Sequence, residues 1–265
     1  MLPGLICCEE GLIKAKLEDP DEKRLISSDY SDLAEMYYCA KEYKKALQAV
    51  EDAIASGNLN EEENLIIRSL SLLKLGEVEK AVYSDTLQQI LAYMLKEIEE
   101  YGEGTWHSAT EEERKTLQKI SKYSLPDELQ KFYHCCLPDK TLALYELTLL
   151  GIEELKKYNC QREFGKFLCE QGFFVIGIGD CGNVYFVDLL DENHPVYQCS
   201  ESIVNGKQFT IYTSRDKEVH VPITRETIQK TSSLHDVHFL FFLYTFAEGM
   251  IEDEEEEMFY RKYCS

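Results

Sequence analysis

The stretch that decides the fold is FFVIGIGDCGNVYFVD, residues 173–188. Its first four residues form an apolar run, and a second run with a strand-like period begins at Asn183. Two such runs joined by Gly, Asp and Asn predict a hairpin whose loop glycines have positive φ. The same strand-like pattern recurs in three later segments, at residues 195–199, 208–213 and 219–223. We therefore expect an antiparallel sheet of five short strands here.

Helices flank these strands along the chain. Residues 108–111 offer a capped start for a helix that runs towards Tyr123. Pro126 stands at the first position of a second helix, residues 127–136, with acids in its first turn. The apolar residues 234–250 predict a closing helix that lies across the sheet. This half of the chain is therefore predicted to be α+β.

The first half of the chain contains almost no helix breakers, since residues 27–100 include no Pro and only two Gly. Apolar and small residues at helical spacing, interrupted near residues 41–43, predict a helical hairpin over residues 30–56. The members of this pattern are Tyr30, Leu33, Ala34, Tyr37, Ala46, Val50 and Ala53. The pattern resembles the tetratricopeptide repeat, in which small residues let two helices approach closely. A generic helical bundle remains the alternative.

The hairpin pattern partly recurs 35 residues later, at Leu65, Leu72, Val78 and Ala81, which predicts stacked hairpins. Two hairpins seldom bury their faces alone, so we expect helices at residues 83–101 and 10–16 to cap them. Two glycines in residues 102–105 then interrupt the helical pattern of the sequence. We place the boundary there, giving a helical domain at residues 1–101 and an α+β domain at residues 102–265.

Charge limits the classes of partner. The chain of 265 residues carries 49 Asp and Glu against 28 Lys and Arg, a formal net charge of −21. Such a surface repels phosphate backbones and anionic lipid, so we expect neither nucleic-acid nor membrane binding. The start of the chain lacks a signal-peptide pattern, and the ten cysteines are irregularly spaced. These features predict a protein of the reducing cytosol, monomeric or weakly dimeric.

Three segments of the second half carry a family resemblance: LPDELQKFY (residues 125–133), GDCGNVYFVD (residues 179–188) and PVY (residues 195–197). They resemble the SUKH superfamily over about residues 106–248. The resemblance implies a protein-binding module without a common catalytic centre. Many bacterial members look like immunity proteins that neutralise delivered toxins, often nucleases, and fungal relatives act as regulators of cell-wall synthesis.

The negative charge fits the first of these roles, because a nuclease site is basic and an acidic protein can occupy it. We therefore expect a basic toxin domain as partner, with no enzymatic activity, catalytic residue, metal or cofactor in this chain. The expected contacts are acids in loops of the sheet domain and in the terminal acidic run. They are Asp180, Asp188, Asp191, Glu192, Glu252, Asp253, Glu254 and Glu255.

Two other functions remain open. An intracellular scaffold or regulator would bind peptides through the helical repeats. A cysteine-dependent enzyme would use Cys135 or Cys136 with His134, since a thiolate needs a neighbouring base or cation. A buried cysteine that acts as a small apolar side chain is the interpretation we prefer.

Two further motifs favour structural interpretations. Residues 177–182 have the Gly-x-Gly-x-x-Gly spacing of a dinucleotide site, but a strand rather than a helix follows them. His235 and His238 are three residues apart and could share a metal, yet two imidazoles are too few ligands. We expect this pair to lie at a helix start beside the aromatic core. The later cysteines also lack the close pairs of a zinc ribbon.

Overall fold

In a computed structural model, the chain forms two compact units, Met1–Tyr93 and Met94–Ser265. The division falls slightly before the boundary expected from the glycines at residues 102–105. Within the part of the chain that the structure describes, every helix is too short or too polar to span a bilayer. The described residues are 2–18, 26–57, 61–75, 87–88, 91–92, 94–96, 98–100, 102–144, 147–179, 182–205, 207–212, 218–236 and 238–243.

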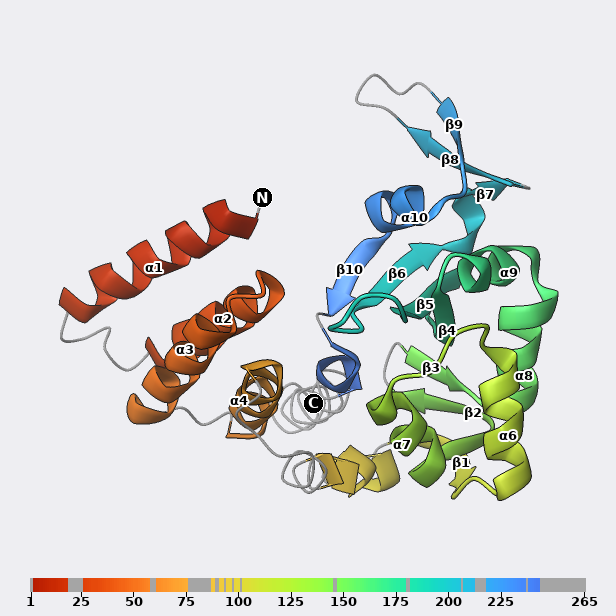
Figure 1. The fold of residues 1–265 in the computed structure, drawn as a ribbon, viewed down its shortest axis with the longest axis horizontal. Helices are drawn as coiled ribbons and strands as arrows, with labels where there is room; N and C mark the ends of the chain where they lie inside the picture. Colours follow the sequence, from red (N-terminus) through yellow and green to blue (C-terminus); the bar gives the residue numbers. More distant parts are fainter. Residues whose placement is uncertain are drawn as a thin grey trace, which may run out of the picture. The chain divides into compact units, whose positions relative to one another are not determined.

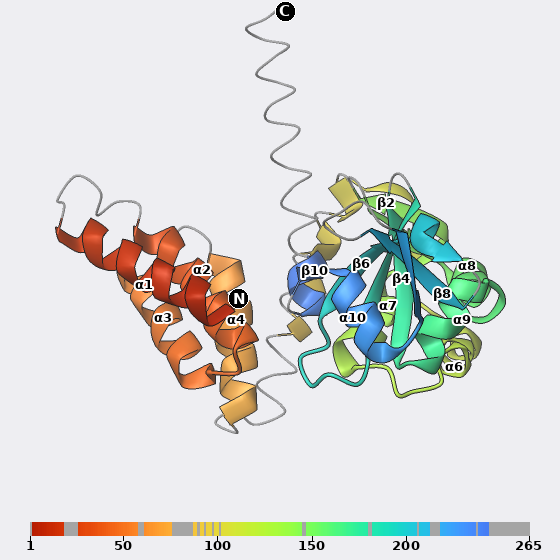
Figure 2. The ribbon, with the colours of Figure 1, turned by 90° about the horizontal axis from the view of Figure 1, so that it is seen from above.

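The longer described helices of the first unit pack in chain order, each against the next (Figure 2). They are α1 (Leu2–Glu18), α2 (Ile26–Cys39), α3 (Tyr43–Ala55) and α4 (Glu61–Leu75). α2 and α3 form the hairpin expected over residues 30–56. Ala34, Ala46 and Ala53 are fully buried, and their small side chains let the two backbones approach. The turn between the helices is closed by Lys41, which has φ 60° and donates its N–H to the Tyr38 carbonyl.

Polar contacts join α1 to this hairpin. The Lys16 ammonium lies 2.7 Å from the Asp29 carboxylate, and the Tyr37 hydroxyl donates to Glu10. Of the second expected hairpin, α4 is present, whereas Val78 and Ala81 lie outside the described residues. The described residues of the helix expected at 83–101 are helical.

The second unit is built on a seven-stranded antiparallel sheet with the order β1-β2-β3-β4-β5-β6-β10 (Figure 1). Its strands are β1 (Glu103–His107), β2 (Leu137–Leu144), β3 (Leu147–Leu150), β4 (Phe173–Gly179), β5 (Asn183–Asp188), β6 (Val196–Ser200) and β10 (Ser233–Asp236). A separate three-stranded sheet contains β7 (Val204–Asn205), β8 (Gln208–Tyr212) and β9 (Glu218–Pro222). All five expected strands exist, but they belong to two sheets, so the single five-stranded sheet was wrong.

The sheets are accompanied by α6 (Glu111–Ile120), α7 (Asp127–Cys135), α8 (Ile152–Lys156), α9 (Glu163–Glu170) and α10 (Arg225–Thr231). α6, α8 and α9 lie along the same side of the large sheet (Figure 1). The two helices expected at residues 111–123 and 127–136 are confirmed as α6 and α7. α6 begins with a complete capping box between Thr110 and Glu113. The second unit is therefore mixed helix and sheet, as the sequence predicts.

The expected closing helix at residues 234–250 is wrong at its start. Residues 233–236 form β10, which pairs with β6 through Leu234 opposite Tyr197 and Asp236 opposite Val196. The helical conformation begins only at Phe239 and continues to Leu243, where the described residues end. An apolar run of this length suits either element, and the open edge of β6 decides for the strand because its backbone groups need partners.

The glycine-rich segment taken as a domain boundary is also a strand. β1 pairs with β2, with a bulge between Gly104 and Trp106. Gly104 has φ 138°, and a Cβ atom there would lie 2.7 Å from the Thr141 carbonyl oxygen. This glycine therefore allows close strand approach instead of forming a linker.

The central strands of the large sheet are covered on both faces. Successive side chains of a strand point to opposite faces, so Tyr185 lies on one face of the sheet and Phe186 lies on the other. Both side chains are buried, Tyr185 at 2% exposure and Phe186 completely, and the Tyr185 ring contacts Phe242. Because both faces are packed, the strands read as continuous apolar runs instead of alternating patterns.

One buried side chain joins the helices to the sheet. Asn159 lies in the π-helical turn Lys157–Gln161, and its Oδ1 accepts the Val175 N–H at 2.8 Å. Its Nδ2 donates to the Val175 carbonyl at 2.9 Å and to the Leu155 carbonyl at 3.0 Å. β3 pairs with β4 only from Gly177 onwards, so the Asn159 amide takes the place of a missing strand neighbour at Val175.

The turn that carries Asn159 packs tightly on Gly165 of α9. A Cβ atom at Gly165 would lie 1.5 Å from the Tyr158 carbonyl oxygen, a distance that backbone atoms cannot relieve without moving. Gly165 is therefore needed for the close approach of α9 to the turn, although its own helix would favour a larger residue.

We predict that Gly165→Ala lowers the stability of the second unit by at least about 2–3 kcal/mol, because α9 and the turn must separate. The single tryptophan, Trp106, lies in this unit, so its fluorescence during urea unfolding measures the effect. Gly11→Ala is the matched control: nothing lies within 4 Å of a Cβ atom there, in the middle of α1. It should raise helix stability by about 0.5–1 kcal/mol and leave the Trp106 transition unchanged. If Gly165→Ala has the same urea unfolding midpoint as the wild type, the close packing of α9 on the turn is contradicted.

Candidate functional site

An open pocket of about 410 Å³ lies where the end of β1, the start of α6 and β2 meet. Four carboxylates line it, from Glu112, Glu113, Asp139 and Glu153, together with His107 and Lys156. Three of these acids have partners, since Lys156 Nζ lies 2.6 Å from Glu153 and His107 contacts Glu113 and Asp139. The four acids still outnumber the bases of the pocket, which makes it the candidate functional site.

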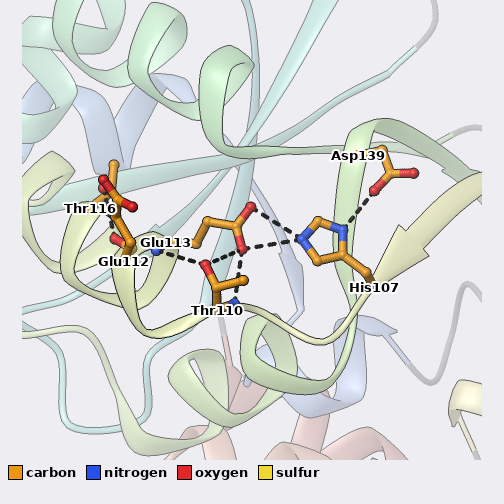
Figure 3. Close-up of polar contacts among 6 residues, drawn as sticks. All are labelled: His107, Thr110, Glu112, Glu113, Thr116 and Asp139. Carbon is orange, nitrogen blue, oxygen red and sulfur yellow. Dashed lines mark hydrogen bonds and ion pairs between the residues drawn. The ribbon is translucent and has the colours of Figure 1, made fainter.

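His107 forms the centre of the pocket, at the end of β1 (Figure 3). Its Nδ1 lies 2.6 Å from Asp139 Oδ1, and its Nε2 lies 3.1 Å from Glu113 Oε1. Each ring nitrogen therefore has a carboxylate partner. The imidazole joins β1 to β2 on one side and to α6 on the other, and it holds both acids at the pocket wall.

The helix cap fixes Glu113. Its Oε2 accepts the Thr110 hydroxyl at 2.7 Å and the Thr110 backbone N–H at 2.8 Å (Figure 3). The Glu113 N–H in turn donates to Thr110 Oγ1 at 3.3 Å. The sequence predicts this cap, but it does not predict that the capping carboxylate also accepts from His107.

These contacts shift the protonation equilibria of the pocket. Hydrogen bonds to Asp139 and then Glu113 raise the pKa of His107 above 6.5. Hydrogen bonds from Thr110 lower the pKa of Glu113, and those from Thr105 and His107 lower the pKa of Asp139. Because both His107 nitrogens face carboxylates, protonated His107 serves as a double donor and is poorly placed as a general base.

A second pocket, of about 440 Å³, has mixed charge. It lies between α6 and α7 and is lined by Arg114, Lys115 and Lys131 together with Glu111 and Asp127. Arg114 already lies 3.1 Å from Glu111, and Lys115 lies 3.5 Å from the same acid. This pocket favours neither sign of partner.

Asp188 has a structural position, so the expectation that it contacts a partner needs correction. It is completely buried at the end of β5, and Arg225 Nη2 lies 2.6 and 2.5 Å from its two oxygens. Gln229 and the backbone N–H groups of Leu190 and Asp191 also donate to it. With its oxygens occupied inside the unit, Asp188 fixes α10 and the turn after β5.

The other expected contact residues divide into two groups. Asp191 is half-buried and Glu192 is exposed, both in the turn between β5 and β6, and Asp191 Oδ1 accepts the Asn193 N–H at 2.9 Å. They therefore lie at the surface, where a partner contact is possible, and that contact stays a prediction. The remaining five expected residues, Asp180, Glu252, Asp253, Glu254 and Glu255, lie outside the described residues.

A second titratable cluster combines residues that are far apart in sequence. Glu128 of α7 is buried, and its Oε1 lies 2.8 Å from His194 Nδ1 and 3.4 Å from His238 Nε2. Burial alone would raise the pKa of Glu128, but the hydrogen bonds from the two histidines outweigh it and lower that pKa. Among the described residues these three form the group whose donor atoms converge enough to hold a metal ion.

The expected histidine pair is thereby split. His235 lies on β10 with its ring against Tyr185 and Phe242, while His238 lies beside Glu128. The aromatic setting expected for the pair is thus found at His235. No spacing signal links residues 128, 194 and 238, so only the fold brings this cluster together.

The thiols at the end of α7 differ in exposure. Cys136 is buried, and burial, then its neighbour Cys135, raises the pKa of the Cys136 thiol to about 12. It is therefore a neutral thiol at physiological pH, which agrees with its expected role as a small apolar side chain. Cys135 is half-buried, and His134 Nε2 lies 3.1 Å from Arg114 Nη1.

Comparisons with known proteins return no match to a family model, to a curated protein or to a solved structure.

We predict that His107 titrates above pH 6.5 and that Asp139→Asn lowers its pKa towards 6.5, because one of its two acceptors is lost. The stability that His107 contributes should be fully present below pH 6.5 and disappear as pH rises through its folded pKa. NMR titration of the His107 ring measures this. Asp127→Asn, at an exposed acid at the start of α7, is the control and should leave the His107 titration unchanged. The proposed contact fails if Asp139→Asn has no effect.

We predict that Arg225→Ala destabilises the second unit by about 3–5 kcal/mol, because it leaves the buried Asp188 carboxylate without its guanidinium partner. Lys230→Ala on the same helix removes the exposed ion pair with Glu226 and should barely change the midpoint. Urea unfolding followed by Trp106 fluorescence compares the two. Equal unfolding midpoints for the two variants would show that the buried Arg225–Asp188 pair stabilises the unit no more than the exposed pair does.

Proposed function

We propose that this chain is a non-catalytic protein-binding module of the reducing cytosol, and specifically an immunity protein that neutralises a basic bacterial toxin domain by stoichiometric binding. A nuclease domain is the simplest such partner. One observation carries the proposal: a chain of net charge −21 also holds an open pocket that four carboxylates line beside one lysine and one histidine.

The pocket offers a place for a cationic side chain. Glu113 and Asp139 are held by His107, Glu153 of α8 pairs with Lys156, and Glu112 of α6 lines the same pocket. An arginine of the partner would find carboxylates already oriented, which lowers the entropic cost of binding. The net charge would also steer a basic partner over a longer range, with association rates towards ~10⁸–10⁹ M⁻¹s⁻¹ at low salt.

The resemblance to the SUKH superfamily supports the same role. Its segments at residues 125–133, 179–188 and 195–197 fall on α7, the β4–β5 hairpin and the start of β6 in a mixed helix and sheet unit. Within that family, immunity proteins work by occupying a toxin. The turn between β5 and β6, with Asp191 and Glu192, is a second candidate contact surface.

A scaffold function is the second candidate, and the hairpin α2–α3 favours it. Its buried alanines give the close helix packing that repeat proteins use to build a peptide groove. Such a scaffold or regulator would bind several cellular peptides instead of one toxin.

The cysteine-dependent enzyme has less support. Cys136 is a neutral buried thiol, and His134 lies against Arg114. A thiol-directed probe that labels native Cys135 at neutral pH would revive that function.

We predict that co-expression with the toxin domain encoded beside this gene restores growth and yields a 1:1 complex. Two charge reversals of equal size then locate the contact: Glu112→Lys with Glu153→Lys, and Asp191→Lys with Glu192→Lys. Both pairs should slow association alike, because they change the net charge equally. Only the pair that lies in the interface should also speed dissociation, by about tenfold or more, and the pocket pair is expected to do so.

Biolayer interferometry at low and physiological salt separates the two rates. A complex whose dissociation changes only with the Asp191 and Glu192 pair would move the interface to the β5–β6 turn. If no complex forms, growth is not restored, and the chain instead captures several housekeeping proteins, the scaffold function replaces the immunity function.

A further inference from the structure

Three donor atoms from three separate elements converge inside the second unit. Glu128 Oε1 comes from α7, His194 Nδ1 from the turn between β5 and β6, and His238 Nε2 from the segment after β10. All three atoms lie within 4.8 Å of one another. Two imidazoles and one carboxylate form a donor set that first-row transition ions prefer.

The burial of the three side chains differs in a useful way. The side chains of Glu128 and His238 are 6% and 3% exposed, whereas that of His194 is 26% exposed. An ion at the focus of these atoms would be shielded on two sides and reachable from solvent on the His194 side. This is the layout of a site with three protein ligands and one open position.

The hydrogen bonds assign the protons of the cluster. The Leu240 N–H donates to His238 Nδ1 at 3.2 Å, so neutral His238 carries its proton on Nε2 and donates to Glu128. His194 donates to the same oxygen from Nδ1. One buried carboxylate oxygen is thus the focus of two N–H groups, which occupy the position that a cation would take.

We propose that Glu128, His194 and His238 bind one divalent first-row transition ion, for which Zn²⁺ is the natural probe, with water at the fourth position. The ion ties α7, the β5–β6 turn and the segment after β10 together. It would order the turn that carries Asp191 and Glu192. The donor geometry carries this site, and it holds whether or not the chain binds a toxin.

The proton balance predicts a structural consequence. The metal takes the lone pairs of His194 Nδ1 and His238 Nε2, so each bound ring carries its proton on the other nitrogen. The proton of His238 then lies on Nδ1 and faces the Leu240 N–H, which must turn away. Loss of that hydrogen bond reduces the affinity by roughly 10- to 100-fold, and it predicts a shift of residues 239–243 on metal binding.

The test uses the full chain after removal of metal with a chelator. Calorimetry should show one saturable Zn²⁺ site, and Zn²⁺ at 100 times its Kd should raise the Trp106 melting midpoint by about 5–10 °C. His194→Gln should weaken the affinity by at least about 10- to 100-fold. His220→Gln, at an exposed histidine of β9, is the matched control and should bind as the wild type does.

Exposed thiols are the competing site, because Cys7 and Cys8 are adjacent on α1 and Cys160 is also exposed. The Co²⁺ spectrum distinguishes them: the proposed ligands give visible d–d bands without a thiolate charge-transfer band. This readout needs no variant, so it remains decisive if His194→Gln fails to fold. Absence of a 1:1 site, a thiolate band, or unchanged Zn²⁺ affinity in folded His194→Gln would each overturn the proposal and leave a hydrogen-bonded cluster.

Discussion

The second unit depends on one side-chain amide, that of Asn159. Where β4 continues past the end of β3, the backbone N–H and C=O of Val175 lose their strand neighbour inside the core. Both groups bond to Asn159, so a side chain completes the ladder that the backbone leaves open. Buried backbone groups without partners are costly, and this contact therefore anchors α8, α9 and the π-helical turn to the centre of the sheet. Gly165 allows that anchor by leaving room for the Tyr158 carbonyl.

The second unit holds its carboxylates in two kinds of environment, one in the interior and one at the surface. Asp188 and Glu128 are buried, and each is surrounded by donors: Arg225 at the first and two histidines at the second. Both join elements that are distant in sequence, because a buried carboxylate is tolerated only where several donors converge. At the surface, the pocket around His107 instead gathers four carboxylates, of which Glu113 and Asp139 contact His107 and Glu153 contacts Lys156. Interior acids therefore join distant elements of the fold, and the acids of this pocket join β1, β2 and α6 through His107.

Local patterns account for much of the architecture. The hairpin of β4 and β5, the capped helix α6, the helix α7 and the helical hairpin α2–α3 were all predicted, because their signals lie within neighbouring residues. The helical conformation predicted for residues 234–236 was wrong. These residues begin the largely apolar segment 234–250, which predicts a helix, but the unpaired edge of β6 selects the strand. β1 was missed for a related reason, since Gly104 reads as a linker until β2 lies beside it.

The sequence by itself determined the mixed class of the second unit, the positions of β4, β5, β6, β8 and β9, and the excess of negative charge. Propensity and capping depend on neighbouring residues, and net charge depends on composition alone. The tertiary structure alone decided the division of the strands into two sheets, the burial of Asp188, and the meeting of His107 with Asp139 and of Glu128 with His194 and His238. The physical reason is that a hydrogen bond or an ion pair depends on distances of about 3 Å between atoms. Spacing along the chain does not encode such distances when the partners lie on different elements.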